Sequence, residues 1–229
     1  MKQPPFSDAR FNVGNPADPG QPSSRQVVQA YGRLAPLYDL VFGRVLEPGR
    51  RLMAKQVSAA APASILEVGV GTGLALAGYP ASSKIVGIDL SAEMLQRAGQ
   101  RAAGMPGRHI EFFQMDAEAM DFPDHSFDCV TLPYVLSVTP HPARLVHEVR
   151  RVCKPGGLIF VLNHFNGSRF WWLMERAVRR ATQHVGFRSD FDYAEQVLAY
   201  DWEVASVQAV NLLGLSKLVT LRNQPPHRP

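Results

Sequence analysis

Residues 65–73 read ILEVGVGTG, a short apolar run that leads directly into three closely spaced glycines. This order predicts a buried strand, a tight turn and the start of a helix. Glycine is needed where the backbone turns tightly or lets a ligand approach within contact distance. Position 74 is leucine, whereas a dinucleotide fingerprint needs glycine there, and no Gly-Lys-Ser/Thr of a P-loop follows. The pattern Glu-x-Gly-x-Gly-x-Gly, beginning at Glu67, therefore favours another ligand.

Two further acids follow later predicted strands. Asp89 ends the second strand, 22 residues after Glu67, and a carboxylate there can accept both hydroxyls of a ribose. Asp116 follows the third strand. A glycine loop alone is weak evidence, but acids at the ends of three strands beside it strongly indicate a nucleoside site. The alternative is that Asp89 and Asp116 only cap the helices that follow.

From residue 63 onward, short apolar runs alternate with helical segments, which favours an α/β fold with a doubly wound parallel sheet. The predicted strands are Ser64–Gly69, Lys84–Asp89, His109–Gln114, Phe127–Leu132 and Gly157–Asn163. The predicted helices begin near Gly73, Ser91, Pro142 and Ser168. Two last runs, Trp202–Asn211 and Leu215–Arg222, predict a closing antiparallel hairpin around Leu212–Gly214.

The composition is that of an ordinary globular protein with one large domain. Of 229 residues, 46% are hydrophobic and 19% are charged. The sequence contains no run of about 20 apolar residues, so we expect no membrane-spanning helix. Its first residues also lack the pattern of a signal peptide, and we therefore expect a cytoplasmic protein. Cys129 and Cys153 form no Cys-x-x-Cys pair, and we expect no bound metal.

The chain divides into four expected parts. Residues 1–23, rich in Pro, Gly, Asn and Ser, predict a disordered tail. Residues 24–62 predict a helical cover or membrane-facing segment, with helices over about 25–35, around 38–42 and from near Pro48. The expected inner face of the third helix consists of Leu52, Met53, Val57 and Ala60. Residues 63–222 would form the main domain, and residues 223–229 a short tail.

The glycine loop and its acids resemble those of class I S-adenosylmethionine-dependent methyltransferases, over about residues 63–165. The resemblance implies a Rossmann-like, seven-stranded sheet whose last hairpin inserts one antiparallel strand. It implies S-adenosyl-L-methionine as cofactor and S-adenosyl-L-homocysteine as product. It also implies contacts to the methionyl end from Glu67, Gly69, Gly71, Gly73 and the backbone carbonyl at Leu132. Asp89 would hold the ribose, Leu90 would pack on adenine, and Asp116, beside Ala117, would accept from its amino group.

The segment after the fourth predicted strand bears on the methyl acceptor. Enzymes that methylate amino groups of flat bases typically carry Asn/Asp-Pro-Pro-Tyr there, but residues 131–134 read TLPY. The acid or amide and the first proline are missing, and no basic RNA-binding domain is appended. We therefore expect no nucleic-acid partner.

Other short segments resemble the bacterial phosphatidylethanolamine N-methyltransferases that are soluble but membrane-associated. They are Tyr31, LYDLVFG at 37–43, NHF at 163–165 and HVGFRSDF at 184–191, together with residues 66–73. This resemblance spans nearly residues 30–222. It implies a phospholipid substrate and stepwise methylation of the headgroup amine, through monomethyl and dimethyl forms, toward phosphatidylcholine.

Basic residues concentrate in two segments, 24–60 and 168–188, which suggests an anionic partner. On the helix predicted from Ser168, apolar residues share one face. The opposite face carries Trp172, Arg176, Arg179 and Arg180. Tryptophan beside arginine is typical of a membrane interface, so we predict peripheral binding to the anionic inner face of the membrane, where the arginines meet lipid phosphate. The alternative is that Trp172 packs internally and the arginines are merely solvated.

Amine methylation requires a neutral amine, so the site must hold the acceptor and let a proton leave. The candidate residues are Tyr31, Tyr38, Tyr134, His141 and His164. A phenol can accept from the amine and face the methylated cation, and a histidine can accept the proton. Each is equally consistent with an ordinary role in the core, in a lid or at a helix start.

Two other functions fit the same cofactor site. One is C- or O-methylation of a quinone or another small apolar acceptor. The other is non-catalytic sensing of S-adenosylmethionine or its product by a membrane-bound protein. The glycine loop and the acids do not distinguish among these functions.

Overall fold

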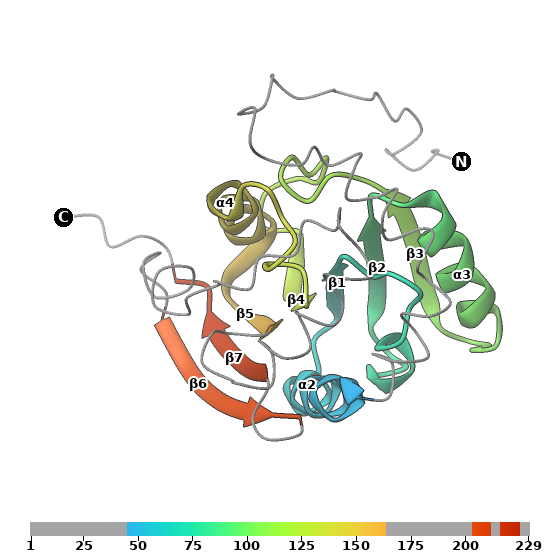
Figure 1. Cartoon of the computed structure of the whole chain (residues 1–229), viewed down its shortest axis with the longest axis horizontal. Coiled ribbons are helices and arrows are strands. Elements are labelled where there is room, and N and C mark those ends of the chain that lie inside the picture. The colour runs from blue at the N-terminus through green and yellow to red at the C-terminus, as the bar shows by residue number, and fades with distance from the viewer. Residues whose placement is uncertain (1–44, 164–202, 212–215, 225–229) are drawn as a thin grey trace, which may run out of the picture.

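The computed structural model describes residues 45–163, 203–211 and 216–224 (Figure 1). The expected tail over residues 1–23, the helices expected over 25–35 and 38–42, and the helix expected from Ser168 lie outside the described residues. Those expectations therefore stay predictions.

Seven strands form one sheet in the order β3-β2-β1-β4-β5-β7-β6. Their bounds are β1 Ser64–Val68, β2 Lys84–Asp89, β3 His109–Gln114, β4 Phe127–Pro133, β5 Cys153–Asn163, β6 Glu203–Val210 and β7 Ser216–Arg222. Strands β1 to β5 pair in parallel, and β7 lies antiparallel between β5 and β6. The doubly wound sheet with one inserted antiparallel strand is confirmed.

The central strands are almost entirely apolar, as a parallel sheet covered on both faces requires. β2 and β3 have the predicted bounds, whereas β1 ends one residue earlier and β4 one residue later than predicted. β5 begins at Cys153 rather than Gly157, because Cys153 already pairs with Phe127 before a register shift. The strand ends that carry the predicted acids are therefore where the sequence places them.

Helices cover both faces of the sheet. They are α2 (Glu47–Ala60), α3 (Ala92–Ala103) and α4 (Pro142–Val152). Neighbouring residues of β1 point to opposite faces: Leu66 belongs to the buried cluster with Val149 of α4, and Ile65 to the cluster with Met53 of α2. Figure 1 shows α2 and α4 on opposite sides of the sheet. Within the described parts of the chain, no helix is long and apolar enough to cross a membrane.

The inner face of α2 is largely as predicted. Met53 and Val57 are fully buried, and Leu52 is partly buried against the same cluster. Ala60 is exposed, so its place on the inner face was predicted wrongly. The helix ends there, and the next residue, Ala61, has a φ of 45°.

A helix beginning near Gly73 was also predicted wrongly. This segment holds only a 3-10 turn, η1 (Leu76–Gly78). Gly73 has a φ of 77°, and Gly78 and Pro80 follow closely. Glycine disfavours a helix interior and proline ends one, so the segment makes a compact loop instead.

Candidate active site

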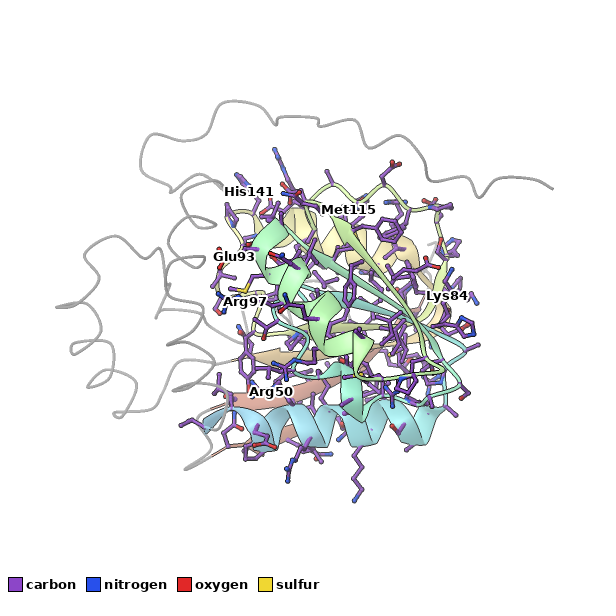
Figure 2. All side chains as sticks on the ribbon, turned by 90° about the vertical axis from the view of Figure 1, so that its right-hand side faces the viewer. Arg50, Lys84, Glu93, Arg97, Met115 and His141 are labelled. Carbon is purple, nitrogen blue, oxygen red and sulfur yellow. The ribbon has the colours of Figure 1, made fainter. Side chains whose placement is uncertain are left out.

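A cavity lies at the carboxyl ends of the parallel strands, where open α/β sheets bind their ligands. The glycine loop, the ends of β2 and β3, the segment after β4 and the start of α2 all contribute to its lining. Figure 2 labels two lining residues, Arg50 on α2 and Met115, which lies far from α2 in that view. The Glu67 end of the cavity is defined by Arg50, Glu67 and Tyr134, and the Asp116 end by Met115, Asp116 and Glu118.

The glycine loop approaches the segment after β4 closely. Gly69 and Gly71 have φ values of +64° and +55°, which residues with side chains rarely adopt. A Cβ atom at Gly69 would lie 2.4 Å from Cγ2 of Val135. Both glycines line the cavity, as the sequence predicts. Their missing side chains let a ligand reach the backbone.

Two predicted cofactor residues are not among the described residues that line the cavity. Gly73 packs under the loop: a Cβ atom there would lie 2.7 Å from Cδ1 of Leu76 and 3.4 Å from Ala98. Leu132, a residue of β4, is 2% exposed, and its side chain belongs to the core. Because β4 runs one residue further than predicted, the wall is formed by residues 133–135 instead.

Asp89 lines the cavity at the end of β2 and is fixed by backbone donors. Its Oδ2 accepts from the N–H of Gly71 at 2.9 Å, and its Oδ1 accepts from the N–H of Ser91 at 2.9 Å. Burial raises the pKa of the Asp89 carboxyl, and backbone hydrogen bonds from Ser91, Gly71 and Leu90 oppose that rise. Asp89 thereby joins the glycine loop to the start of α3 at the place where the sequence predicts a ribose.

The Asp116 end combines apolar surface with acceptors. Leu90, Met115 and Ala117 line the cavity beside Asp116. Oδ1 of Asp116 accepts from the N–H of Glu118 at 2.9 Å, which turns the loop after β3 back on itself. A flat base can lie on this apolar surface while a carboxylate accepts from its amino group, so the geometry is compatible with the predicted adenine contacts.

Glu118 ties the loop after β3 to the segment after β4. Its carboxylate accepts from the Thr139 hydroxyl at 2.6 Å and from the His141 N–H at 2.8 Å, and it contacts Nδ1 of His141 at 2.8 Å. The His141 side chain is 43% exposed and is not among the described residues that line the cavity. This position favours a structural role for His141 over the predicted role as proton acceptor.

Glu67 is the buried acid of the cavity. It is 1% exposed, and its Oε2 has no hydrogen-bond partner among the described residues. Burial raises the pKa of this carboxyl to about 8, against a hydrogen bond with Tyr79 and the positive charge of Arg50. A buried acceptor without a partner suits a ligand that brings a cation, such as the ammonium group of S-adenosylmethionine. The residues present therefore fit the methionyl end of that cofactor.

Tyr134 lines the cavity, but its hydroxyl is bonded to the start of α2 and to the residue after β6. The hydroxyl oxygen accepts from Nδ2 of Asn211 at 3.1 Å, and the O–H donates to the Leu46 carbonyl at 3.4 Å. Asn211 also accepts from the Gly49 N–H at 2.8 Å and donates to the Ser216 hydroxyl at 2.8 Å. We call this hydrogen-bonded set the α2 clasp; its members are Gly49, Tyr134, Asn211 and Ser216. These contacts favour a structural role for the Tyr134 hydroxyl over the predicted catalytic one.

The remaining predicted site residues lie outside the described residues. They are Tyr31, Tyr38, His164, Trp172, Arg176, Arg179 and Arg180. Their roles in catalysis and in membrane binding stay predictions.

Sequence reasoning missed three residues of the site. Arg50 and Arg51 are adjacent, and no sequence signal shows that only the first lines the cavity. Glu118 follows Asp116 by two residues, the spacing of a turn closed by an aspartate side chain, and this signal could have found it. Asn211 lies at the end of a predicted strand and carries no local signal.

Comparisons with known proteins agree with this geometry. The family described as "Methyltransferase domain" matches residues 66–161. Over 167 residues the chain is 42% identical to the phosphatidylethanolamine N-methyltransferase of Cereibacter sphaeroides, covering 72% of this chain and 81% of that protein. It is 32% identical over 146 residues to a ubiquinone/menaquinone biosynthesis C-methyltransferase of Hahella chejuensis, covering 59% of this chain and 58% of that protein.

A solved structure extends the comparison of the fold. The chain resembles the cyclase SpnF with a TM-score of 0.69 and 21% identity, covering 89% of this chain and 98% of that one. At this identity the likeness concerns the fold alone. Because a cyclase has a similar fold, the fold alone does not identify the reaction, and only the site and closer relatives bear on it.

Proposed function

We propose that this chain, which belongs to the class I S-adenosylmethionine-dependent methyltransferases, methylates the headgroup amine of phosphatidylethanolamine. The observation that carries the proposal is the 42% identity to a phosphatidylethanolamine N-methyltransferase over most of both chains. The monomethyl and dimethyl lipids would be further substrates on the way to phosphatidylcholine. Segments before and after the family match, at residues 37–43 and 184–191, support the same acceptor by resemblance.

The cofactor would lie across the cavity from the Glu67 end to the Asp116 end. Glu67 would accept from the methionyl ammonium, and the backbone at Gly69 and Gly71 would leave room for the chain. Asp89 would accept from the ribose hydroxyls. Adenine would lie at the Asp116 end, against the residues that line it: Leu90, Asp116 and Ala117. When bound, the cofactor supplies an electrophilic methyl group on a sulfonium.

The protein's own task is to place the amine in line with that methyl group and to let a proton leave. A primary amine has a pKa of about 10.4, so roughly one molecule in a thousand is neutral at pH 7. The Tyr134 hydroxyl and the His141 ring already have protein partners in the α2 clasp and at Glu118. Tyr31, Tyr38 and His164 are therefore the candidates that we retain for accepting from the amine and for removing its proton.

A quinone or another small apolar acceptor is the second candidate, favoured by the 32% identity to a quinone C-methyltransferase. The cofactor contacts would be the same for both acceptors. They differ in the need for a lipid surface, because phosphatidylethanolamine is presented in a bilayer.

Membrane association at the cytoplasmic face is part of the proposal. Trp172, Arg176, Arg179 and Arg180 would face the lipid, and each arginine near an anionic surface contributes about 1 kcal/mol. Flotation with anionic and neutral liposomes should show binding that requires anionic lipid and weakens with salt. Replacing Arg179 and Arg180 by Glu should weaken flotation strongly without changing the affinity for S-adenosylhomocysteine. Equal flotation with both liposome types at all salt concentrations would remove this part of the proposal.

The acceptor is tested by incubating the protein with methyl-labelled S-adenosylmethionine and liposomes. Separate liposomes contain phosphatidylethanolamine, its monomethyl form, its dimethyl form or a quinone precursor. We expect label in the three phospholipids. Label in the quinone precursor alone would replace the proposed acceptor, and cofactor binding without transfer to any acceptor would favour a sensor.

A further inference from the structure

Arg50 is the one lysine or arginine among the described residues that line the cavity, whereas four lining residues are acids. It lies in the first turn of α2, directly after Gly49. Its positive charge opposes the rise that burial causes in the pKa of both Glu67 and Tyr134. Arg50 therefore lies within electrostatic reach of the buried carboxylate at the Glu67 end.

The α2 clasp fixes the backbone beside this arginine. Tyr134 and Asn211 are hydrogen-bonded to each other and have φ values of 63° and 65°, which makes them two of the few described non-glycine residues with positive φ. Asn211 accepts from the Gly49 N–H at 2.8 Å. A Cβ atom at Gly49 would lie 3.0 Å from the Tyr134 hydroxyl and 3.1 Å from Oδ1 of Asn211, so any other residue would have to push these groups apart. Strained backbone persists where its surroundings over-determine it, often at ligand sites.

An arginine and a carboxylate at one end of a cavity complement an α-amino acid. Such a ligand carries an ammonium and a carboxylate on the same carbon. The guanidinium presents paired donors that match a carboxylate, and Glu67 offers an acceptor that matches the ammonium. Among the residues that the structure describes, the Asp116 end offers no such pair, because its charged lining residues, Asp116 and Glu118, are both acids.

We propose that Arg50 binds the carboxylate of the methionyl cofactor beside Glu67, and that Tyr134 and Asn211 are positioning residues that hold Arg50 there. The inference rests on the proposed binding of S-adenosylmethionine but not on the identity of the methyl acceptor. The other oxyanion with the same chemistry is the phosphate of a lipid headgroup, and the experiment separates the two.

The test compares the affinities for S-adenosylmethionine and for its decarboxylated form, which keeps the sulfonium and the amine. Both are titrated calorimetrically without an acceptor into wild type, Arg50→Gln and Arg51→Gln. Arg51 is a matched control, because its side chain is 79% exposed and pairs with Glu47 at 2.7 Å. We expect wild type and Arg51→Gln to favour the carboxylate by roughly tenfold to a hundredfold, as a charge-assisted contact does. In Arg50→Gln, we expect the ratio of the affinities for S-adenosylmethionine and for its decarboxylated form to fall close to one.

A wild-type ratio in Arg50→Gln would overturn the proposal. If that variant instead raised the KM for phosphatidylethanolamine liposomes, the anion at Arg50 would be lipid phosphate. Absence of binding of either cofactor form to wild type would overturn the proposed function itself. Absence of transfer to phosphatidylethanolamine would overturn only the acceptor, because the titrations contain none.

The positioning residues are tested with Tyr134→Phe, which removes the hydroxyl, and Asn211→Gly, which removes the amide but tolerates positive φ. Each should lower the carboxylate preference several-fold in the wild-type background and leave it unchanged in the Arg50→Gln background. Thermal unfolding of each variant reports whether it folds. If both variants weakened the binding of the two cofactor forms equally, the α2 clasp would contribute to stability alone, and the positioning part of the proposal would be wrong.

Discussion

Asp89, at the end of β2, and Glu67, near the end of β1, are both acids that line the cavity, yet their contacts differ. Both carboxylate oxygens of Asp89 accept from backbone N–H groups at 2.9 Å. Glu67 keeps Oε2 buried and without a partner among the described residues. Burial raises the pKa of both carboxyls, and it raises that of Glu67 to about 8.

This difference shows two ways of preparing an acid for a ligand. Backbone N–H groups of the glycine loop and of the residue before α3 fix the orientation of the Asp89 carboxylate, so it can accept from a neutral hydroxyl group. Glu67 has a hydrogen bond with Tyr79, but its Oε2 has no donor among the described residues, and a ligand that carries a cation can satisfy it. We therefore expect changes at Asp89 to affect every adenosine ligand and changes at Glu67 to depend on the ligand's ammonium group and on pH.

Replacing Asp89 with Ala should have the largest effect on binding. It removes the ribose acceptor and also frees the N–H groups of Gly71 and Ser91. Two charge-assisted hydrogen bonds are worth about 1.5–3 kcal/mol each, so the affinity for S-adenosylhomocysteine should fall by roughly a hundredfold or more. Titration calorimetry measures the loss, and Glu111→Gln, an exposed acid paired with Lys84 at 3.2 Å, is the control. Unchanged affinity in a folded Asp89→Ala protein would contradict the ribose assignment.

Replacing Glu67 with Gln should change how stability depends on pH. The folded pKa of about 8 exceeds the ordinary value of 4.5, so the folded protein without cofactor holds a proton that the unfolded chain releases. This group therefore costs stability progressively as pH rises from about 4.5 to 8. Relative to wild type, the free energy of unfolding of Glu67→Gln should rise by on the order of a few kcal/mol across that pH window. Urea unfolding at several pH values measures this gain, and parallel profiles for the two proteins would show that Glu67 is not buried as an acid.

Replacing Gly69 with Ala should weaken ligand binding by roughly tenfold, because the substitution strains the loop by about 1–3 kcal/mol. The φ of +64° disfavours any side chain, and the new methyl would lie 2.4 Å from Val135. Gly107→Ala is a matched control, with a φ of +79° and no atom of the described residues within 4 Å of its Cβ position. Both variants should unfold at lower temperature, but only Gly69→Ala should lose affinity for S-adenosylhomocysteine. Equal affinities would mean that the loop can relax away from Val135.

Replacing His141 with Ala should have the smallest effect. The ring is partly exposed and paired with Glu118, and such a pair is worth about 0.2–1 kcal/mol. We expect the turnover number to change by less than about threefold and the affinity for 5′-methylthioadenosine to fall slightly. A hundredfold loss of turnover would restore His141 as a catalytic proton acceptor.

The parts of the fold that local pattern determines were predictable from sequence. β2 and β3 have the predicted bounds because each is a compact run of strand-forming residues ended by a polar residue. The helix expected after Gly73 does not form, because the positive φ of Gly73 and the nearby Gly78 and Pro80 outweigh the apolar residues between them. Gly73 fits the motif by its spacing, and Leu76 and Ala98 fill the space where its Cβ would lie; its contact with the cofactor stays a prediction.

The site was predictable where it lies at strand ends and unpredictable where distant segments meet. The positions of Asp89 and Asp116 beside the cavity follow from the order of the strands alone. The bond between Gly49 and Asn211 joins residues 162 positions apart, and the Tyr134 hydroxyl reaches Asn211 across 77 positions. Nothing local in the sequence encodes these contacts, so a tyrosine beside the cavity is equally compatible with catalysis and with the α2 clasp. The same holds for Arg50, whose place depends on the rotation of α2.

The central claim is that the ammonium group of the cofactor completes the Glu67 end. Its most direct test is calorimetric titration of wild type at pH 7 in two buffers with different ionisation enthalpies. Because Glu67 is mostly protonated below its pKa of about 8, binding S-adenosylhomocysteine should ionise it and release close to one proton. 5′-Methylthioadenosine, which lacks the amino-acid part, should release none. Equal proton release, or none with either ligand, would contradict the account.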